Sequence, residues 1–323
     1  MRRGLRVVAT LLVTSLAVTY ILSKIDVGKT VDTIGSASVP WLVVSALLTV
    51  STVPLMAWRW QRLLDVRGIH ERVRWLVRAY FVSYAVGQVL PTGVGGDASR
   101  IFETARRHPG SITPITGAVL LERALGGVVT LVLAGGGLLL AIGRYPIGAY
   151  LWIVAAFVAG SILFAFVFFS ATMRRRLAFL LPVTRRLRLE RPARAVYEGL
   201  HGYRSERRAM LTVALVTAAA QLIRVVAIYA SARAVGIHLS LLPYVVLGPL
   251  LFLVMLVPFT INGLGVREAF FVSFLGRLDV GHDAAFACGF LFFVMTLLLA
   301  LPGLVIVLWE NVFGRARIAN ATP

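Results

Sequence analysis

The fold of this chain depends most on a glycine-rich interruption of an apolar run, Leu90-Pro91-Thr92-Gly93-Val94-Gly95-Gly96-Asp97-Ala98-Ser99-Arg100. A second interruption follows much later, Val257-Pro258-Phe259-Thr260-Ile261-Asn262-Gly263-Leu264-Gly265-Val266-Arg267-Glu268. Proline, glycine and arginine recur in the two stretches at the same offsets. Because proline and glycine interrupt helices, each stretch predicts a broken helix. The predicted backbone breaks involve Pro91, Gly93, Gly95, Gly96, Pro258, Gly263 and Gly265.

The composition is that of an integral membrane protein. Of the 323 residues, 59% are hydrophobic and only 15% are charged, which leaves too little polar surface for an ordinary soluble domain. The net charge of +19 comes mostly from arginines in the hydrophilic links between apolar runs. This is the positive-inside pattern, so we do not interpret it as nucleic-acid binding. One cysteine and scattered histidines predict no internal disulfide, metal site or cofactor.

The apolar runs predict the membrane topology. Crossing the hydrocarbon core takes about 20 residues, and about six runs qualify, at residues 4–23, 40–58, 117–142, 148–171, 209–235 and 284–309. The basic residues place both termini and the arginine-rich link 172–208 in the cytoplasm. We therefore predict an all-α, multi-pass protein of the cell (inner, cytoplasmic) membrane. Residues 1–323 form a single transmembrane domain, with approximate halves 1–171 and 209–323.

The two interrupted runs are predicted to enter the membrane from opposite faces. Counting crossings from the link 172–208, the run 75–96 enters and leaves on the cytoplasmic side, whereas the run 241–278 enters and leaves on the outer side. Two re-entrant broken-helix hairpins of this kind are typical of an inverted-topology repeat. The alternative is that each hairpin is a pair of short full crossings.

Both breaks predict an anion site. Non-helical backbone at membrane depth is tolerated only inside protein or around a wet cavity. We expect Asp97 to cap one restarting helix and a second helix to restart near Val266, so that each presents free N–H groups to the break. Arg100 and Arg267 are unfavourable near such helix starts unless an anion supplies negative charge, and guanidinium groups suit phosphate. We expect both arginines to face one shared cavity.

A structural interpretation of these arginines stays open. Arg100 and Arg267 would then extend to opposite membrane interfaces, with Arg100 pairing with Glu103 and Arg267 pairing with Glu268. Arg224 is harder to explain in this way, because it lies in the middle of the run 209–235 without an acidic neighbour along its own helix.

Other side chains complete the candidate site. Acidic or amide groups that orient the arginines or receive an aminoacyl or sugar headgroup are Asp97, Glu103, Glu122, Asn262 and Glu268. Tyr80, Tyr84 and Gln88 share a helical face that leads into the first break, which we interpret as packing, with cavity lining as the alternative. Arg59 is interpreted as an anchor at a span end. Gly135-Gly136-Gly137 should let helices approach closely.

The two motifs carry a family resemblance. Residues 90–97 with Arg100, and residues 262–269, resemble the paired motifs of the flippase-like transmembrane region of lysylphosphatidylglycerol synthetases. The resemblance covers nearly the whole chain and is to the members that carry only this region. It implies movement of an aminoacylated phospholipid between leaflets. No sizeable soluble domain follows Arg317, so we expect no aminoacyl transferase activity.

We therefore predict a lipid flippase rather than an enzyme, whose partner is a membrane phospholipid or glycolipid, modified by an aminoacyl or sugar group or unmodified. One rival is a membrane-embedded enzyme acting on lipid phosphate or a lipid-linked sugar, which needs an acid–base constellation near an interface. A second rival is a small-anion or proton-coupled carrier that uses the same helix breaks. A scaffolding role has only the basic link in its favour.

Overall fold

The computed structural model describes residues 26–89, 94–146, 148–169, 203, 206–256, 263 and 265–319. Every regular element in these ranges is helical, which confirms the predicted all-α class for this part of the chain. In chain order the helices are α2 (Val27–Gly35), α3 (Val39–Val66), α4 (Val73–Val89), α5 (Val94–Arg107), α6 (Ile112–Ala141), the short 3-10 helix η1 (Gly148–Tyr150), α7 (Leu151–Phe169), α11 (Arg207–Ala234), α12 (Leu242–Leu256), α13 (Val266–Gly276), α14 (His282–Leu298) and α15 (Ala300–Ala319).

The long apolar helices fit the predicted crossings. Within the described ranges, four helical stretches are long and apolar enough to span a membrane: α3, α6, α11 and the pair α14 and α15 over His282–Glu310. They coincide with four of the predicted runs, and α7, 19 residues long, occupies a fifth. The predicted first span 4–23 and most of the link 172–208 lie outside the described residues. The chain is a multi-pass membrane protein, and the total number of crossings stays a prediction.

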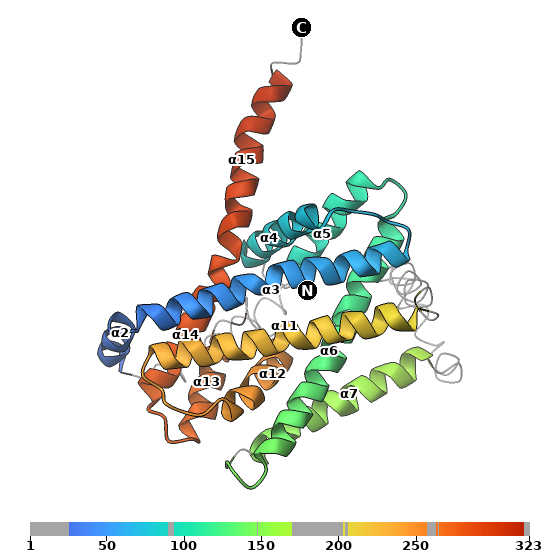
Figure 1. The fold of residues 1–323 in the computed structure, drawn as a ribbon. Coiled ribbons are helices and arrows are strands. Elements are labelled where there is room, and N and C mark those ends of the chain that lie inside the picture. Colours follow the sequence, from blue (N-terminus) through green and yellow to red (C-terminus); the bar gives the residue numbers. More distant parts are fainter. Residues whose placement is uncertain are drawn as a thin grey trace, which may run out of the picture.

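The helices form a bundle in which helices from both halves of the chain pack on one another. Helices α3 and α11 run side by side over much of their length, with α6 and α12 against them (Figure 1). The α4–α5 pair packs beside α3, and α15 packs on α4 before it extends beyond the other helices (Figure 1). This arrangement brings the first interrupted run within side-chain reach of α11, from the other half of the chain, where Arg224 Nη2 lies 3.4 Å from the Tyr84 hydroxyl.

Both predicted helix interruptions occur. Helix α4 ends at Val89 and α5 begins at Val94, while α12 ends at Leu256 and α13 begins at Val266. The restart near Val266 is therefore confirmed. Before it, Gly263 and Gly265 have φ angles of 74° and 82°, a conformation that glycine adopts without steric cost. Pro91, Gly93, Pro258 and Asn262 lie outside the described residues.

The described residues after the first break differ from the prediction. Gly95 and Gly96 lie inside the first turn of α5, and Asp97 follows them within the helix instead of capping it. These two glycines therefore do not form the break. Gly96 is needed for close packing instead: a Cβ atom there would lie 2.5 Å from the Ser83 carbonyl oxygen of α4. Two helices can approach this closely only where one lacks a side chain.

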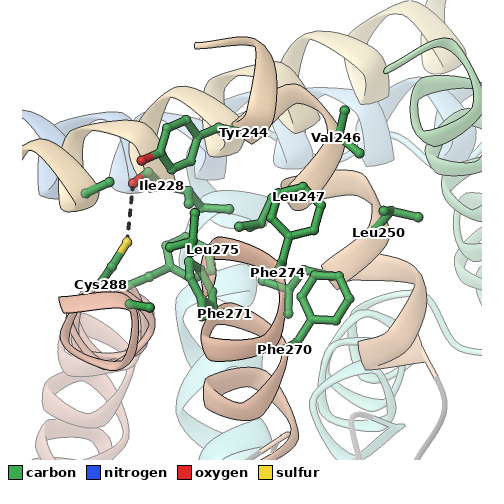
Figure 2. Packing of buried hydrophobic residues seen from close by; sticks show 14 of the residues in the cluster. Ile228, Tyr244, Val246, Leu247, Leu250, Phe270, Phe271, Phe274, Leu275 and Cys288 are labelled. Atoms are coloured by element: carbon green, nitrogen blue, oxygen red, sulfur yellow. Dashed lines mark hydrogen bonds between the residues drawn. The ribbon is translucent and has the colours of Figure 1, made fainter. Parts of the chain in front are cut away.

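Buried apolar side chains form two clusters. One joins α11, α12, α13 and α14, where Tyr244, Leu247, Phe271 and Phe274 pack together and the Cys288 thiol lies 4.0 Å from the Ile228 carbonyl oxygen (Figure 2). The other surrounds Trp60 on α3 and extends over α4 and α6. Helices α6 and α11 contribute to both clusters, so the two halves of the chain pack into each other.

Adjacent glycines on α6 provide a matched test of this packing. A Cβ at Gly137 would lie 2.8 Å from the Val245 carbonyl oxygen of α12, whereas a Cβ at Gly136 would meet nothing within 4 Å. Gly137→Ala should lower the free energy of unfolding by about 1–3 kcal/mol, because it forces two helices apart. Gly136→Ala should be neutral, or stabilising by up to about 1 kcal/mol. Denaturation midpoints in detergent micelles measure both, and equal midpoints would show that α6 and α12 are not in close contact.

Candidate functional site

A cavity of about 410 Å³, with charged groups set in a largely apolar wall, lies among α3, α4, α5, α6, α11 and α12. It has the size of a typical small-ligand or headgroup site. Part of its wall is apolar, with Met56, Phe252 and Met255 among the lining residues. The charged side chains that line it are Arg59, Asp97, Arg100, Glu122, Arg123 and Arg224. Four positive and two negative groups therefore surround one small space.

Glu122 of α6 is the centre of the charged network. It is 4% exposed, and its carboxylate accepts hydrogen bonds from the Tyr80 hydroxyl at 2.6 Å and from Arg100 Nη1 at 2.9 Å. Arg59 Nη2 donates to the same carboxylate, and Arg59 Nη1 donates to Thr217 Oγ1 at 2.9 Å. Such charge-assisted bonds are roughly twice as strong as neutral ones. One carboxylate thus joins α3, α4, α5 and α6, and Arg59 extends the network to α11.

Arg100 connects Glu122 to a second carboxylate. Its Nε lies 3.0 Å from Asp97 Oδ1, one turn earlier on α5, and the other oxygen of Asp97 accepts a bond from Arg123. The guanidinium carbon of Arg100 lies 4.8 Å from the ring centres of both Trp60 and Tyr80, so the cation is also stabilised by aromatic faces. Arg100 itself is only 3% exposed.

Helical spacing explains why these groups share one wall. Tyr80, Tyr84 and Gln88 recur every four residues on α4, and all three line the cavity. On α5, Gly96 and Arg100 have the same separation, so the close contact at Gly96 holds the face that carries Arg100 against α4. We interpreted the α4 face as packing, and the structure shows that it also lines the cavity.

Arg224 lies on the α11 side of the cavity. Its Nη2 is 3.4 Å from the Tyr84 hydroxyl, a long contact, and no carboxylate in the described part of the chain forms an ion pair with it. One turn earlier, Gln221 Nε2 donates to Thr130 Oγ1 of α6 at 2.9 Å. This wall therefore offers a cation that no described carboxylate neutralises.

Arg267 does not line this cavity. It is 4% exposed, and its Nε and Nη2 atoms lie 2.9 and 2.6 Å from Glu268 Oε1. The other Glu268 oxygen accepts the Gly265 N–H at 2.8 Å, and Arg267 stacks on Phe293. The expectation that Arg100 and Arg267 face one cavity is wrong. The negative charge expected from a ligand comes instead from Glu268, at a position where helices favour acidic side chains.

Two further expectations also need correction. Glu103 pairs with Arg78 at 2.9 Å, and not with Arg100, while the same Arg78 also contacts Glu310 of α15. Arg59 is not an anchor at a span end, because α3 continues to Val66 and buries it. Arg59 is a site residue that the sequence analysis missed, whereas Arg123 adjoins the predicted site residue Glu122. The adjacent Glu122 and Arg123 gave a signal, since paired charges in an apolar run are commonly functional.

A separate ion-pair cluster holds the far end of the α4–α5 pair. Glu71, just before α4, accepts bonds from Arg107 Nε at 2.5 Å and pairs with His108 Nε2 at 3.1 Å. Burial raises the pKa of Glu71, but the bonds to Arg107 and His108 outweigh it and hold that pKa below its usual value. These ion pairs join the start of α4 to the end of α5, at the end of the helix pair opposite the break. No three His, Cys, Asp or Glu side chains within the described ranges are placed to hold a metal ion.

Comparison with known families matches residues 7–303 to the family described as the lysylphosphatidylglycerol synthase TM region. No curated protein matches the chain.

Proposed function

This chain belongs to the lysylphosphatidylglycerol synthase transmembrane-region family, and from that membership and the charged cavity we propose that it moves a phospholipid or a modified lipid between the two leaflets of the membrane. The family makes it a membrane protein linked to lipid modification or lipid transport. The proposed step is transport rather than catalysis. The modified lipid would be aminoacylated or glycosylated, as the family resemblance implies.

The cavity is the observation that supports this proposal. Its volume of about 410 Å³ suits a polar headgroup, whereas acyl tails would stay in the surrounding lipid. Arg100, Arg123 and Arg224 offer guanidinium groups, which bind phosphate oxygens through paired hydrogen bonds. Both cavity carboxylates are held in arginine pairs, so neither has the free environment that a general acid or base requires.

The short helices on either side of the two breaks are the elements that we propose form the transport pathway. Helices α4, α5, α12 and α13 have 17, 14, 15 and 11 residues, short of the roughly 20 that cross a bilayer. Residues of both α4 and α5 line the cavity. From the α12–α13 pair, Met255 of α12 lines the cavity and also contacts Gly263 at the break. We propose that the pairs are re-entrant hairpins of an inverted repeat, with both termini cytoplasmic, and that their rocking alternates access.

Leaflet-resolved lipid transport in proteoliposomes tests this function. We expect the wild type to move lipid, and Arg224→Ala to slow transport by about tenfold or more, because a hydrogen bond to a charged group contributes about 1.5–3 kcal/mol. Arg233→Ala is the matched control. It changes an arginine on the same helix that stacks on Trp41 and does not line the cavity.

One result would reject the proposed function, and another would reject the proposed site. Absence of lipid movement by the folded wild type would reject the flippase function itself. Equal transport by the wild type, Arg224→Ala and Arg233→Ala would reject the cavity as the headgroup site. Denaturation midpoints of the three proteins establish that differences in transport do not arise from unfolding.

A further inference from the structure

The cavity charges form an alternating chain. Arg59 contacts Glu122, Glu122 contacts Arg100, Arg100 contacts Asp97, and Asp97 contacts Arg123. Three cations and two anions thus alternate across α3, α5 and α6, and the chain both begins and ends with a cation. Each carboxylate is shared between two arginines, so these five described residues together carry one excess positive charge.

Arg224 of α11 adds a second excess charge to the cavity lining. It has no ion pair with a described carboxylate, and its contact to the Tyr84 hydroxyl brings no negative charge. Within the described ranges, the charged residues that line the cavity therefore sum to two positive charges.

An uncompensated charge in a site of low polarity is costly, so the favoured ligand is the one that restores neutrality. A headgroup with two negative charges does so. A phosphodiester with one negative charge leaves one cation unmatched, and a headgroup that carries an added amino group leaves at least two. Arg123 is 44% exposed on its side chain, which leaves its guanidinium within reach of a ligand, as Arg224 is.

We propose that this cavity selects lipid headgroups that carry a phosphate monoester or diphosphate, with about two negative charges, over aminoacylated, cationic headgroups. The inference rests on the proposed lipid transport and narrows its substrate. The proposed substrate therefore differs from lysylphosphatidylglycerol, the lipid in the name of the family. Guanidinium forks from α6 and α11, carried by Arg123 and Arg224, match the several oxygens of a terminal phosphate.

Equilibrium binding to the full-length protein in nanodiscs tests this selection without requiring transport. The probes are short-chain phosphatidic acid, phosphatidylglycerol and lysylphosphatidylglycerol at about pH 8, where a phosphate monoester carries nearly two charges. We expect affinity to fall in that order, with phosphatidic acid binding about tenfold or more tightly than the lysyl lipid. Equal affinities, or tighter binding of the lysyl lipid, would overturn the proposal.

Variants of one residue test whether the charge excess causes the preference. Arg224→Gln should weaken phosphatidic acid binding about tenfold, since it removes one charged hydrogen-bond donor, while Arg224→Lys should keep most of the preference. Arg233→Gln is the control and should bind as the wild type does. An unchanged preference in a folded Arg224→Gln protein would contradict the proposal.

Inorganic phosphate serves as a further probe that separates this inference from the proposed function. Weak binding of inorganic phosphate beside tight binding of phosphatidic acid supports a lipid substrate. If inorganic phosphate binds as tightly as phosphatidic acid, the selection for two negative charges stands and the ligand is a soluble anion. The lipid-transport proposal would then fail while the charge selection survives.

Discussion

Replacing Glu122 with alanine is expected to lower the free energy of unfolding by about 3–5 kcal/mol, the usual cost of removing one partner from a buried ion pair. Glu122 is 4% exposed and is the only described carboxylate that contacts Arg59. Its loss also removes a hydrogen-bond acceptor from Tyr80 and from Arg100. Two buried guanidinium groups would then repel each other without an anion between them. Denaturant titration in detergent micelles, followed by circular dichroism, measures the change.

Glu310→Ala is the matched control for this prediction. Glu310 also pairs with an arginine, Arg78, but its side chain is 56% exposed and Arg78 keeps Glu103 as a second partner. An exposed pair of this kind contributes about 0–1 kcal/mol. Glu122→Gln adds a further comparison, because it keeps the side-chain volume and removes only the charge. If Glu122→Ala cost no more than Glu310→Ala, the buried network would not stabilise the fold.

Replacing Glu268 with alanine is expected to destabilise the second helix restart by a similar amount, about 3–5 kcal/mol. Its two carboxylate oxygens hold different groups, one the Arg267 guanidinium and the other the Gly265 N–H at the start of α13. The loss of the cap alone accounts for about 1 kcal/mol. The remainder comes from Arg267, which is 4% exposed and, among the described residues, would keep only the aromatic face of Phe293.

A double-mutant cycle separates the two contributions. The double variant Arg267→Ala/Glu268→Ala removes the buried cation together with its partner, so it should lose less stability than the two single variants summed. Additive losses would show that Arg267 and Glu268 act independently. Because neither residue lines the cavity, folded protein carrying Glu268→Gln should keep the headgroup preference of the wild type.

Much of the fold follows from the sequence read in short windows. The length of an apolar run and the presence of glycine or proline act locally, so the crossings at α3, α6 and α11 and the interruptions after Val89 and Leu256 were predictable. Arg224 was also predictable as an isolated intramembrane cation, because the absence of an acidic neighbour on its own helix is visible in the sequence.

The candidate site was predicted only in part, because ion pairing depends on which helices meet. Arg59 was assigned to a span end, yet the packing of α3 on α6 makes it a partner of Glu122. Glu103 lies only three residues from Arg100 in sequence, yet the distant Glu122 of α6 is its partner, since Glu103 pairs with Arg78. No local pattern distinguishes these partners.

The sequence alone therefore determined that this protein is an all-helical, multi-pass membrane protein of one family, with two paired helix interruptions. The tertiary structure decided what the two paired arginines do. Arg100 joins a cavity whose cations outnumber its carboxylates, and Arg267 is neutralised by Glu268 outside that cavity. The reason is physical: hydrophobic length and helix breaking are properties of neighbouring residues, whereas the counterion of a buried charge is set by contacts between helices that lie far apart in the chain.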